Sequence, residues 1–83
     1  MFRIYNSESG HELGVYPGVD RAAAYLAMLD DAGAYSALAA KLREEAAEAG
    51  DLDAIAIIDR GDRADVASMI LDGNPDVVVV SVE

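Results

Sequence analysis

The sequence contains no cysteine, no tryptophan, a single histidine (His11) and a single lysine (Lys41). The absence of cysteine excludes disulfide bonds and thiolate catalysis. The longest apolar run, Ala22–Leu29, is far shorter than the roughly 20 residues that cross a bilayer as a helix. The N-terminal segment MFRIYN is typical of a strand, with no basic region before an apolar run, so we expect no secretory signal and a soluble, cytoplasmic protein.

The length and composition predict one folded domain spanning residues 1–83. Hydrophobic residues make up 53% of the chain, which is typical of a folding sequence rather than a disordered one. A domain of this size buries only about 60% of the surface of its unfolded chain. Oligomerisation is therefore one way in which it could gain stability.

Charge is strongly unbalanced. Sixteen acidic residues oppose six basic ones, which gives a formal net charge of −10. Such a charge repels nucleic acids and anionic membranes and attracts basic surfaces, and in cells these belong mostly to nucleic-acid-binding proteins. Simple solubility in an acid-rich proteome is the alternative explanation.

The first half of the chain predicts a hairpin followed by two helices. Phe2–Asn6 and His11–Tyr16 alternate in polarity as strands do, and the SESG turn between them is short. Apolar residues then recur at helical spacing from Val19 to Ala32 and from Ala34 to Ala49. Gly33 separates these helices so closely that we expect a helical hairpin, or one helix broken at the glycine.

The second half predicts a β-α-β unit. The run AIAIID (Ala54–Asp59) suggests a buried strand, Asp62 suggests the N-cap of a helix that reaches Leu71, and DVVVVSV (Asp76–Val82) is the strongest strand signal. We therefore predict an α+β fold, in the order β-β-α-α-β-α-β, with a mixed four-stranded sheet and an inserted helical hairpin. The last two strands are apolar on both faces, so helices on both sides or a partner subunit should cover them.

Signals for catalysis, cofactors or metals are weak, and we predict none of these sites and no enzyme. The only histidine, His11, and the nearby serines lie in or beside a hairpin turn, whereas a catalytic triad needs a rigidly held base. Asp51 and Asp53 have the spacing that begins a calcium loop, but the rest of that loop is missing. Arg60 and Arg63 could hold a phosphate at a helix start, although the glycine-rich cradle is absent.

Acidic residues gather where helices should end. Each such acid costs about 0.3–1 kcal/mol at low salt, because a helix C-terminus already carries partial negative charge. A partner that needs this acidity would explain the placement. The candidate partner-binding residues are Asp30, Asp31, Glu44, Glu45, Glu48, Asp51 and Asp53.

The segment SGHELGVYPGVDRAAAYLAMLDDAGAYSAL (residues 9–38) resembles a unit found in small, mostly uncharacterised phage and mobile-element proteins. That unit has a strand pair with LGVY and an alanine-rich helix ending in DAGY. Leu13–Tyr16 match the first motif and Asp31–Gly33 the second, with the tyrosine displaced to Tyr35. In size and charge the whole chain is also similar to anti-CRISPR and other nucleic-acid-mimicking phage inhibitors. This likeness implies a role in the host cell cytoplasm.

We therefore expect a non-enzymatic inhibitor that uses its carboxylates to occupy a basic nucleic-acid-binding surface, for example on a CRISPR effector. It should not bind nucleic acid or membranes directly. The alternative is a small structural or regulatory domain, homodimeric through the Val77–Val82 strand. A phosphate-binding role through Arg60 and Arg63 ranks third.

Overall fold

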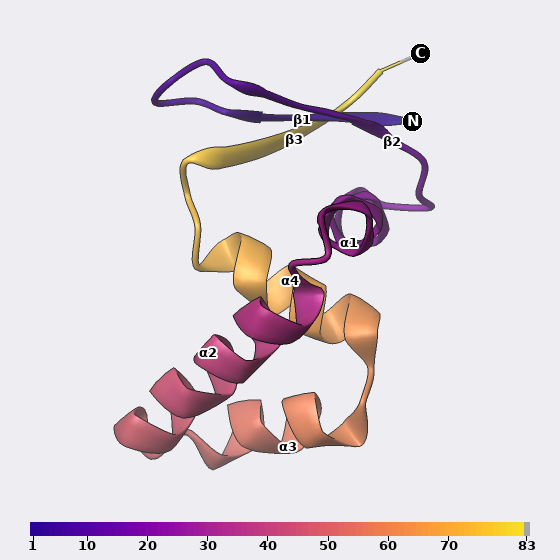
Figure 1. Ribbon diagram of the computed structural model, residues 1–83. Helices are drawn as coiled ribbons and strands as arrows, with labels where there is room; N and C mark the ends of the chain where they lie inside the picture. The colour runs from indigo at the N-terminus through magenta and orange to yellow at the C-terminus, as the bar shows by residue number, and fades with distance from the viewer. Residues whose placement is uncertain (83) are drawn as a thin grey trace.

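The computed structural model describes residues 1–82 and contains a small sheet with four helices (Figure 1). The elements follow in the order β1 (Phe2–Asn6), β2 (Glu12–Tyr16), α1 (Arg21–Ala32), α2 (Tyr35–Ala49), α3 (Leu52–Arg60), α4 (Arg63–Asp72) and β3 (Val77–Ser81). The fold is α+β, as predicted, but its sheet and its third helix differ from the prediction.

The sheet has the order β2-β1-β3, and both pairings are antiparallel. Ile4 on the central strand lies opposite Val79 of β3 and Gly14 of β2. A bulge in the β1–β2 pair falls between Ile4 and Tyr5, near Gly14, whose φ of 129° suits glycine alone. Within residues 1–82 the predicted fourth strand and the parallel pair are absent, so the mixed four-stranded sheet was wrong.

The core lies between one face of the sheet and the helices α1 and α4, which Figure 1 shows beneath it. Because side chains alternate along a strand, Ile4 and Val79 face this layer and are almost fully buried. Tyr25 and Leu29 of α1 pack there with four residues of α4. The four are Val66, Ala67, Ile70 and Leu71.

The first two helices form where the sequence predicts them, and caps explain their ends. Asp20 is the N-cap of α1, because its side chain accepts a hydrogen bond from the Ala23 amide at 2.8 Å. Gly33 ends α1 in the left-handed conformation, and its amide donates to the Asp30 carbonyl. Figure 1 shows α1 nearly end-on while α2 runs across the view, so the two helices do not lie along each other as an antiparallel hairpin.

The run AIAIID belongs to helix α3, not to a strand. The Asp51 side chain accepts from the Ala54 amide at 3.1 Å, and Gly61 ends the helix with φ of 82°. Asp53 in the first turn and Arg60 in the last both oppose the helix dipole favourably. A short apolar run is ambiguous between strand and helix, and here the caps on either side decide for the helix.

Without a β-α-β unit, the expectation that helices cover both faces of the sheet was wrong, whereas cover by a partner subunit stays a prediction. All four helices lie on one side of the sheet (Figure 1), and the opposite face is open. Val15 and Val80 on this outer face are 48% and 37% exposed. Arg3 lies over the ring of Tyr5 there and pairs with Glu12, which covers part of the face.

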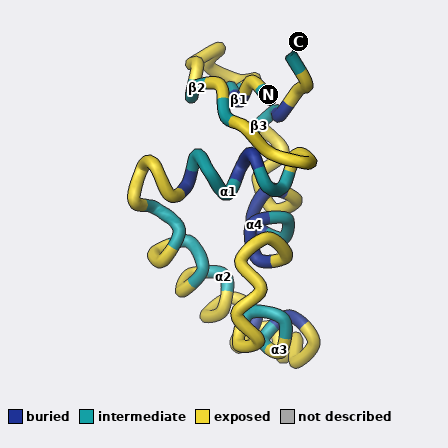
Figure 2. Tube along the Cα trace, turned by 90° about the vertical axis from the view of Figure 1, so that its right-hand side faces the viewer, coloured by how far each residue is buried: buried dark blue, intermediate teal, exposed yellow. Residues whose placement is uncertain are grey.

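The helices α2 and α3 extend away from the sheet and lie side by side (Figure 1). Buried residues lie mainly in α1 and α4, together with Ile4 of β1 and Val79 of β3, whereas α2 and α3 are mostly intermediate or exposed (Figure 2). The radius of gyration is 12.9 Å, against about 12 Å expected for a compact domain of this length. We refer to α2 and α3 as the arm, and to the sheet with α1 and α4 as the core layer.

Candidate functional site

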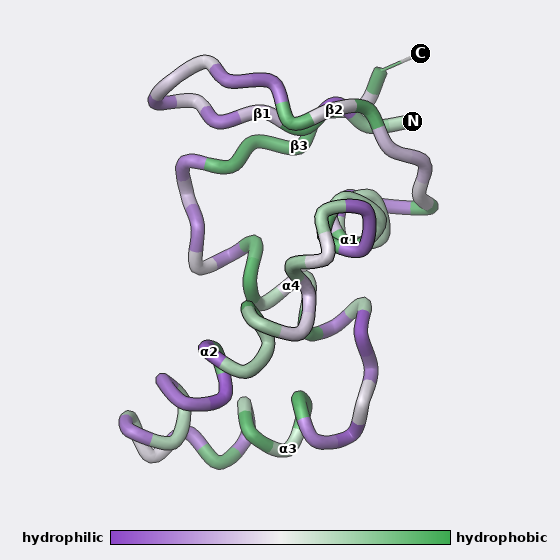
Figure 3. Tube along the Cα trace, in the orientation of Figure 1, coloured by the Kyte–Doolittle hydropathy of each residue, from purple (hydrophilic) through white to green (hydrophobic). Residues whose placement is uncertain are grey.

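Five of the seven predicted residues lie at the far end of the arm, where α2 turns into α3. Glu44, Glu45 and Glu48 lie in the last two turns of α2. Asp51 lies in the turn that follows, and Asp53 lies in the first turn of α3. We call these five the acidic tip: Glu44, Glu45, Glu48, Asp51 and Asp53. All five are exposed. In Figure 3 this end of α2 is coloured as hydrophilic, unlike the apolar strand β3.

The carboxylates of the acidic tip form no ion pair among residues 1–82, although Lys41 lies one turn before Glu45 on α2. The four ion pairs formed among residues 1–82 all use other carboxylates. Arg43 lies on α2 beside the tip, but its guanidinium donates two hydrogen bonds to Asp59 of α3, at 2.8 and 3.1 Å. This pairing lowers the pKa of Asp59 and raises that of Arg43, so both remain charged and neutralise each other. The tip therefore keeps its full negative charge.

Asp30 and Asp31 do not belong to this surface. They lie at the end of α1, and the length of α2, about 22 Å at 1.5 Å per residue, separates them from Asp51. Asp30 pairs with Arg63, which also lies over the ring of Tyr35 at 4.6 Å. Asp31 accepts a hydrogen bond from the Tyr16 hydroxyl at 2.8 Å, and this bond raises the pKa of Tyr16. Both carboxylates thus serve contacts that hold elements together.

The structure also lowers the free-energy cost that the sequence suggested for placing acidic residues at the helix ends of the tip. Asp51 caps α3 and Asp53 lies in its first turn, and both positions favour negative charge. Only Glu45 and Glu48 remain near the C-terminal end of α2, whose last turn has no basic residue. The unfavourable placement that the sequence suggested is therefore confined to α2 in this region.

All five arginines are engaged within the chain. Four of them pair with carboxylates: Arg3, Arg43, Arg60 and Arg63. The fifth, Arg21, donates from Nε to the carbonyl of Val79 at 3.1 Å. Sequence reasoning missed the partners of Arg3, Arg21, Arg43 and Arg63, because these partners are 9 to 58 residues away along the chain. For Arg43 and Asp59, the only available signal was helical spacing in α3, which was read as a strand.

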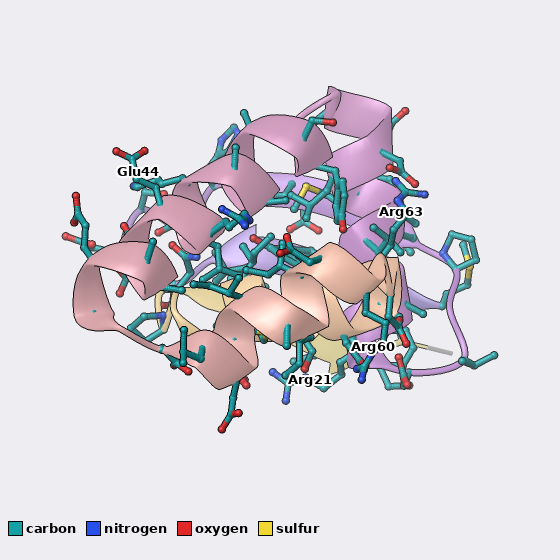
Figure 4. The ribbon with its side chains drawn as sticks, turned by 90° about the horizontal axis from the view of Figure 1, so that it is seen from below. Arg21, Glu44, Arg60 and Arg63 are labelled. Carbon is teal, nitrogen blue, oxygen red and sulfur yellow. The ribbon has the colours of Figure 1, made fainter. Side chains whose placement is uncertain are left out.

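The phosphate hypothesis loses its structural context. Helix α3, not a parallel strand, precedes the turn at Gly61, and Asp62 already caps α4 by accepting from the Asp65 amide. Arg60 donates to Asp65, and Arg63 pairs with Asp30 at the other side of the turn. In Figure 4 Arg60 and Arg63 lie at the opposite end of the view from Glu44. Their positive charge is therefore committed, and it lies away from the acidic tip.

The other sequence candidates remain isolated. His11 is exposed, and its backbone, not its ring, takes part in the hairpin turn through bonds to Asn6 and Ser9. Within the part of the chain that the structure describes, no three His, Asp or Glu side chains converge as a metal site would require. Asp51 and Asp53 act on α3 as described above.

Beside the acidic tip, an open groove of about 140 Å³ runs between α2 and the C-terminal end of α4. Its α2 wall consists of residues at spacings of three and four, which share one side of the helix: Leu38, Lys41, Leu42 and Glu45. Glu48 follows three residues after Glu45, so the same side of α2 leads from the groove to the tip.

The strand proposed for dimerisation is an edge strand of the sheet. The register of β1 and β3 leaves the carbonyl of Val79 pointing away from β1, where another strand could pair. Arg21 occupies that carbonyl. One backbone acceptor on this edge of the sheet is thus already occupied by a side chain of the same molecule.

Comparisons of this chain with protein-family models, curated proteins and solved structures gave no match. Across residues 1–82, no helix has both the length and the apolar character needed to cross a bilayer. The function proposed below therefore depends on the chemistry of the surface itself.

Proposed function

We propose that the protein is a non-enzymatic interaction protein whose acidic tip docks on the basic nucleic-acid-binding surface of another protein. The observation that carries this proposal is the gathering of five exposed carboxylates at one end of the arm, where Arg43, the arginine beside them, is paired with Asp59. A cationic groove built to hold phosphates offers the matching charge.

Helical geometry supports the match. Glu44 and Glu48 lie one turn apart on the same side of α2, at a rise of about 6 Å, and Glu48 is followed by Asp51 in the turn. Because the arm projects from the core layer (Figure 1), these charges can enter a concave surface without the sheet clashing. The function proposed is inhibition, by excluding nucleic acid from the occupied surface.

A CRISPR effector loaded with its guide RNA is the partner to test first, since its channel is built to hold a nucleic-acid backbone. Binding would be measured by titration at about 50 mM and about 200 mM salt, with polylysine as a sequence-independent cation. We expect binding to weaken steeply with salt and target DNA to compete for the site.

The decisive variant is Glu44→Lys/Glu48→Lys, compared with Glu8→Lys/Asp76→Lys, which makes the same change in net charge outside the arm. Loss of about tenfold or more in affinity is expected for the first and little change for the second. Equal losses would mean that net charge alone drives binding. Unchanged function in both variants would favour the alternative, a structural or regulatory domain.

A further inference from the structure

The groove beside the acidic tip has two features that a purely electrostatic docking surface does not need. It has an apolar part, because the half-buried Leu38 and Leu42 of α2 line it together with Met69 and Ile70 of α4, beside polar residues. Its volume of about 140 Å³ is well below the roughly 300–1,000 Å³ typical of sites for small-molecule ligands. A space of this size suits one apolar side chain.

Both walls give the groove a negative character at one end. On α2, Glu45 lines the groove and Glu48 continues the same side of the helix. On the other wall lies the C-terminal end of α4, which carries partial negative charge, ends in Asp72 and has no basic residue in its last turn. Lys41, which is the only lysine in the chain, lines the α2 wall one turn before Glu45, on the side away from the acidic tip.

This charge pattern opposes a second copy of the chain as the occupant. Each copy carries a net charge of −10, and its five arginines are committed to internal bonds. Lys41 alone would be available to meet the acids of the other copy, and it lines the groove itself. The occupant must bring its own positive charge.

We infer that the groove receives an apolar anchor side chain from a basic segment of the partner, whose Lys or Arg residues contact Glu45 and Glu48. This inference rests on the proposed function and adds the kind of segment that is recognised. Buried apolar anchors supply most of the binding energy in protein interfaces, while charges at the rim set the rate and the orientation. Lys41 fixes the direction, because the basic residues of the segment must lie toward the acidic tip.

Gly73 provides a way to fill the groove without disturbing the fold. It lines the groove at the C-cap of α4, with φ of −81°, which any residue can adopt. A Cβ added there would meet only the carbonyl oxygens of Met69 and Ile70, at 3.6 Å, an ordinary van der Waals distance. Gly18, by contrast, would place a Cβ 2.6 Å from the Ala24 amide nitrogen. Gly73→Leu should therefore narrow the groove in a folded protein, and Gly73→Ala is its matched control.

The experiment uses two synthetic peptides with the same six lysines, one with a central phenylalanine and one with serine in its place. Binding to the full chain is followed by fluorescence anisotropy at low and moderate salt. The phenylalanine peptide should bind about tenfold more tightly, the gain expected for burying one aromatic side chain. Gly73→Leu should abolish this difference but leave the affinity for the serine peptide unchanged, whereas Gly73→Ala should retain most of the difference.

The outcomes separate the inference from the proposed function. Equal, salt-sensitive binding of both peptides would overturn the anchor and leave the electrostatic docking surface standing. Binding of neither peptide at low salt would overturn both. A preference for phenylalanine that persists in Gly73→Leu, with circular dichroism showing a native fold, would place the apolar contact elsewhere and also overturn the inference.

Discussion

The core layer and the arm are built from the same kinds of residue but differ in how they are packed. In the core layer nine buried side chains form one cluster, which includes Ile4, Leu29, Val66 and Val79. In the arm only Ala46 and Ala54 are buried, and Leu52 is 76% exposed. Burial of large apolar side chains supplies most of the stability of a small domain. The core layer therefore holds the fold, and the arm extends from it.

Several carboxylates of the core layer also differ from those of the acidic tip in having a specific partner. In the core layer carboxylates such as Glu12, Asp30 and Asp31 have specific partners. In the arm, the carboxylates of the acidic tip form none of the ion pairs found among residues 1–82. Lys41 lies one turn before Glu45 on α2, and Arg43 is paired with Asp59 of α3. A region that contributes little to stability can carry unbalanced charge at little cost to the fold, and this makes the arm the better place for a docking surface.

The largest expected effect comes from the core layer. Leu29→Ala removes a side chain that is 2% exposed, and we expect a loss of about 2–5 kcal/mol in the free energy of unfolding. Leu52→Ala in the arm should change it by less than about 0.5 kcal/mol, because that side chain is mostly in water. Urea denaturation followed by circular dichroism measures both changes in the free energy of unfolding. Similar losses in the two variants would contradict the conclusion that the core layer, and not the arm, stabilises the fold.

Sequence patterns predicted the core layer well, because its signals are local. The hairpin strands, the helix ended by Gly33, the N-cap Asp62 and the final valine-rich strand all lie within one or two residues of their predicted positions. The pairing of the last strand was wrong, since strand order depends on which helices cover the sheet. Once Ala54–Asp59 was taken for a strand, a parallel β-α-β unit followed from it.

For the candidate site, the sequence located the acids of the arm but not their grouping. A reading of Asp51 as a helix cap would have separated the acidic tip from Asp30 and Asp31 and placed α3 correctly. The groove, and the partners of the arginines, depend on contacts between distant segments such as α2 and α4. A single sequence has no local pattern for such contacts.

The next effect tests how the arm is attached. Ile58 is the residue of α3 that packs against the buried cluster of the core layer. Ile58→Ala should cost about 1–2 kcal/mol, less than a core truncation because the side chain is only half-buried. Amide hydrogen exchange should show lost protection in α3 while the strands and α4 retain theirs. An equal loss in every element would mean that arm and core layer unfold as one unit.

A smaller effect should appear as the pH is lowered. The Arg43 guanidinium lowers the pKa of Asp59 in the folded protein below its ordinary value of 3.8. Its contribution is therefore complete above that value and is lost as the pH falls through the folded pKa. The protection of α3 amides from hydrogen exchange, taken relative to the intrinsic exchange rate at each pH, should fall below about pH 4. Asp59→Asn should show the lower protection already at neutral pH, and a pH response of the protection that survives in this variant would contradict the assignment.

The smallest effect distinguishes Asp31 from the acids of the arm. Its hydrogen bond, and secondarily burial and its negative charge, raise the pKa of Tyr16 above the ordinary 10.0. Because the protonated hydroxyl is the donor, this contact stabilises the fold below pH 10 and is lost as the pH rises through the folded pKa. Asp31→Asn should move the pKa of Tyr16 back toward its ordinary value, as followed by carbon NMR of the ring.

The neighbouring variant Asp30→Asn is the matched control, because that carboxylate faces Arg63 and not the tyrosine. Burial raises the pKa of Tyr25 as well, so the titration has to be resolved residue by residue rather than by total absorbance. A Tyr16 titration unchanged by Asp31→Asn would mean that Asp31 is available to solvent. Asp31 would then belong with the unpaired acids, and the contrast between partnered carboxylates at the end of α1 and unpaired carboxylates at the acidic tip would no longer hold.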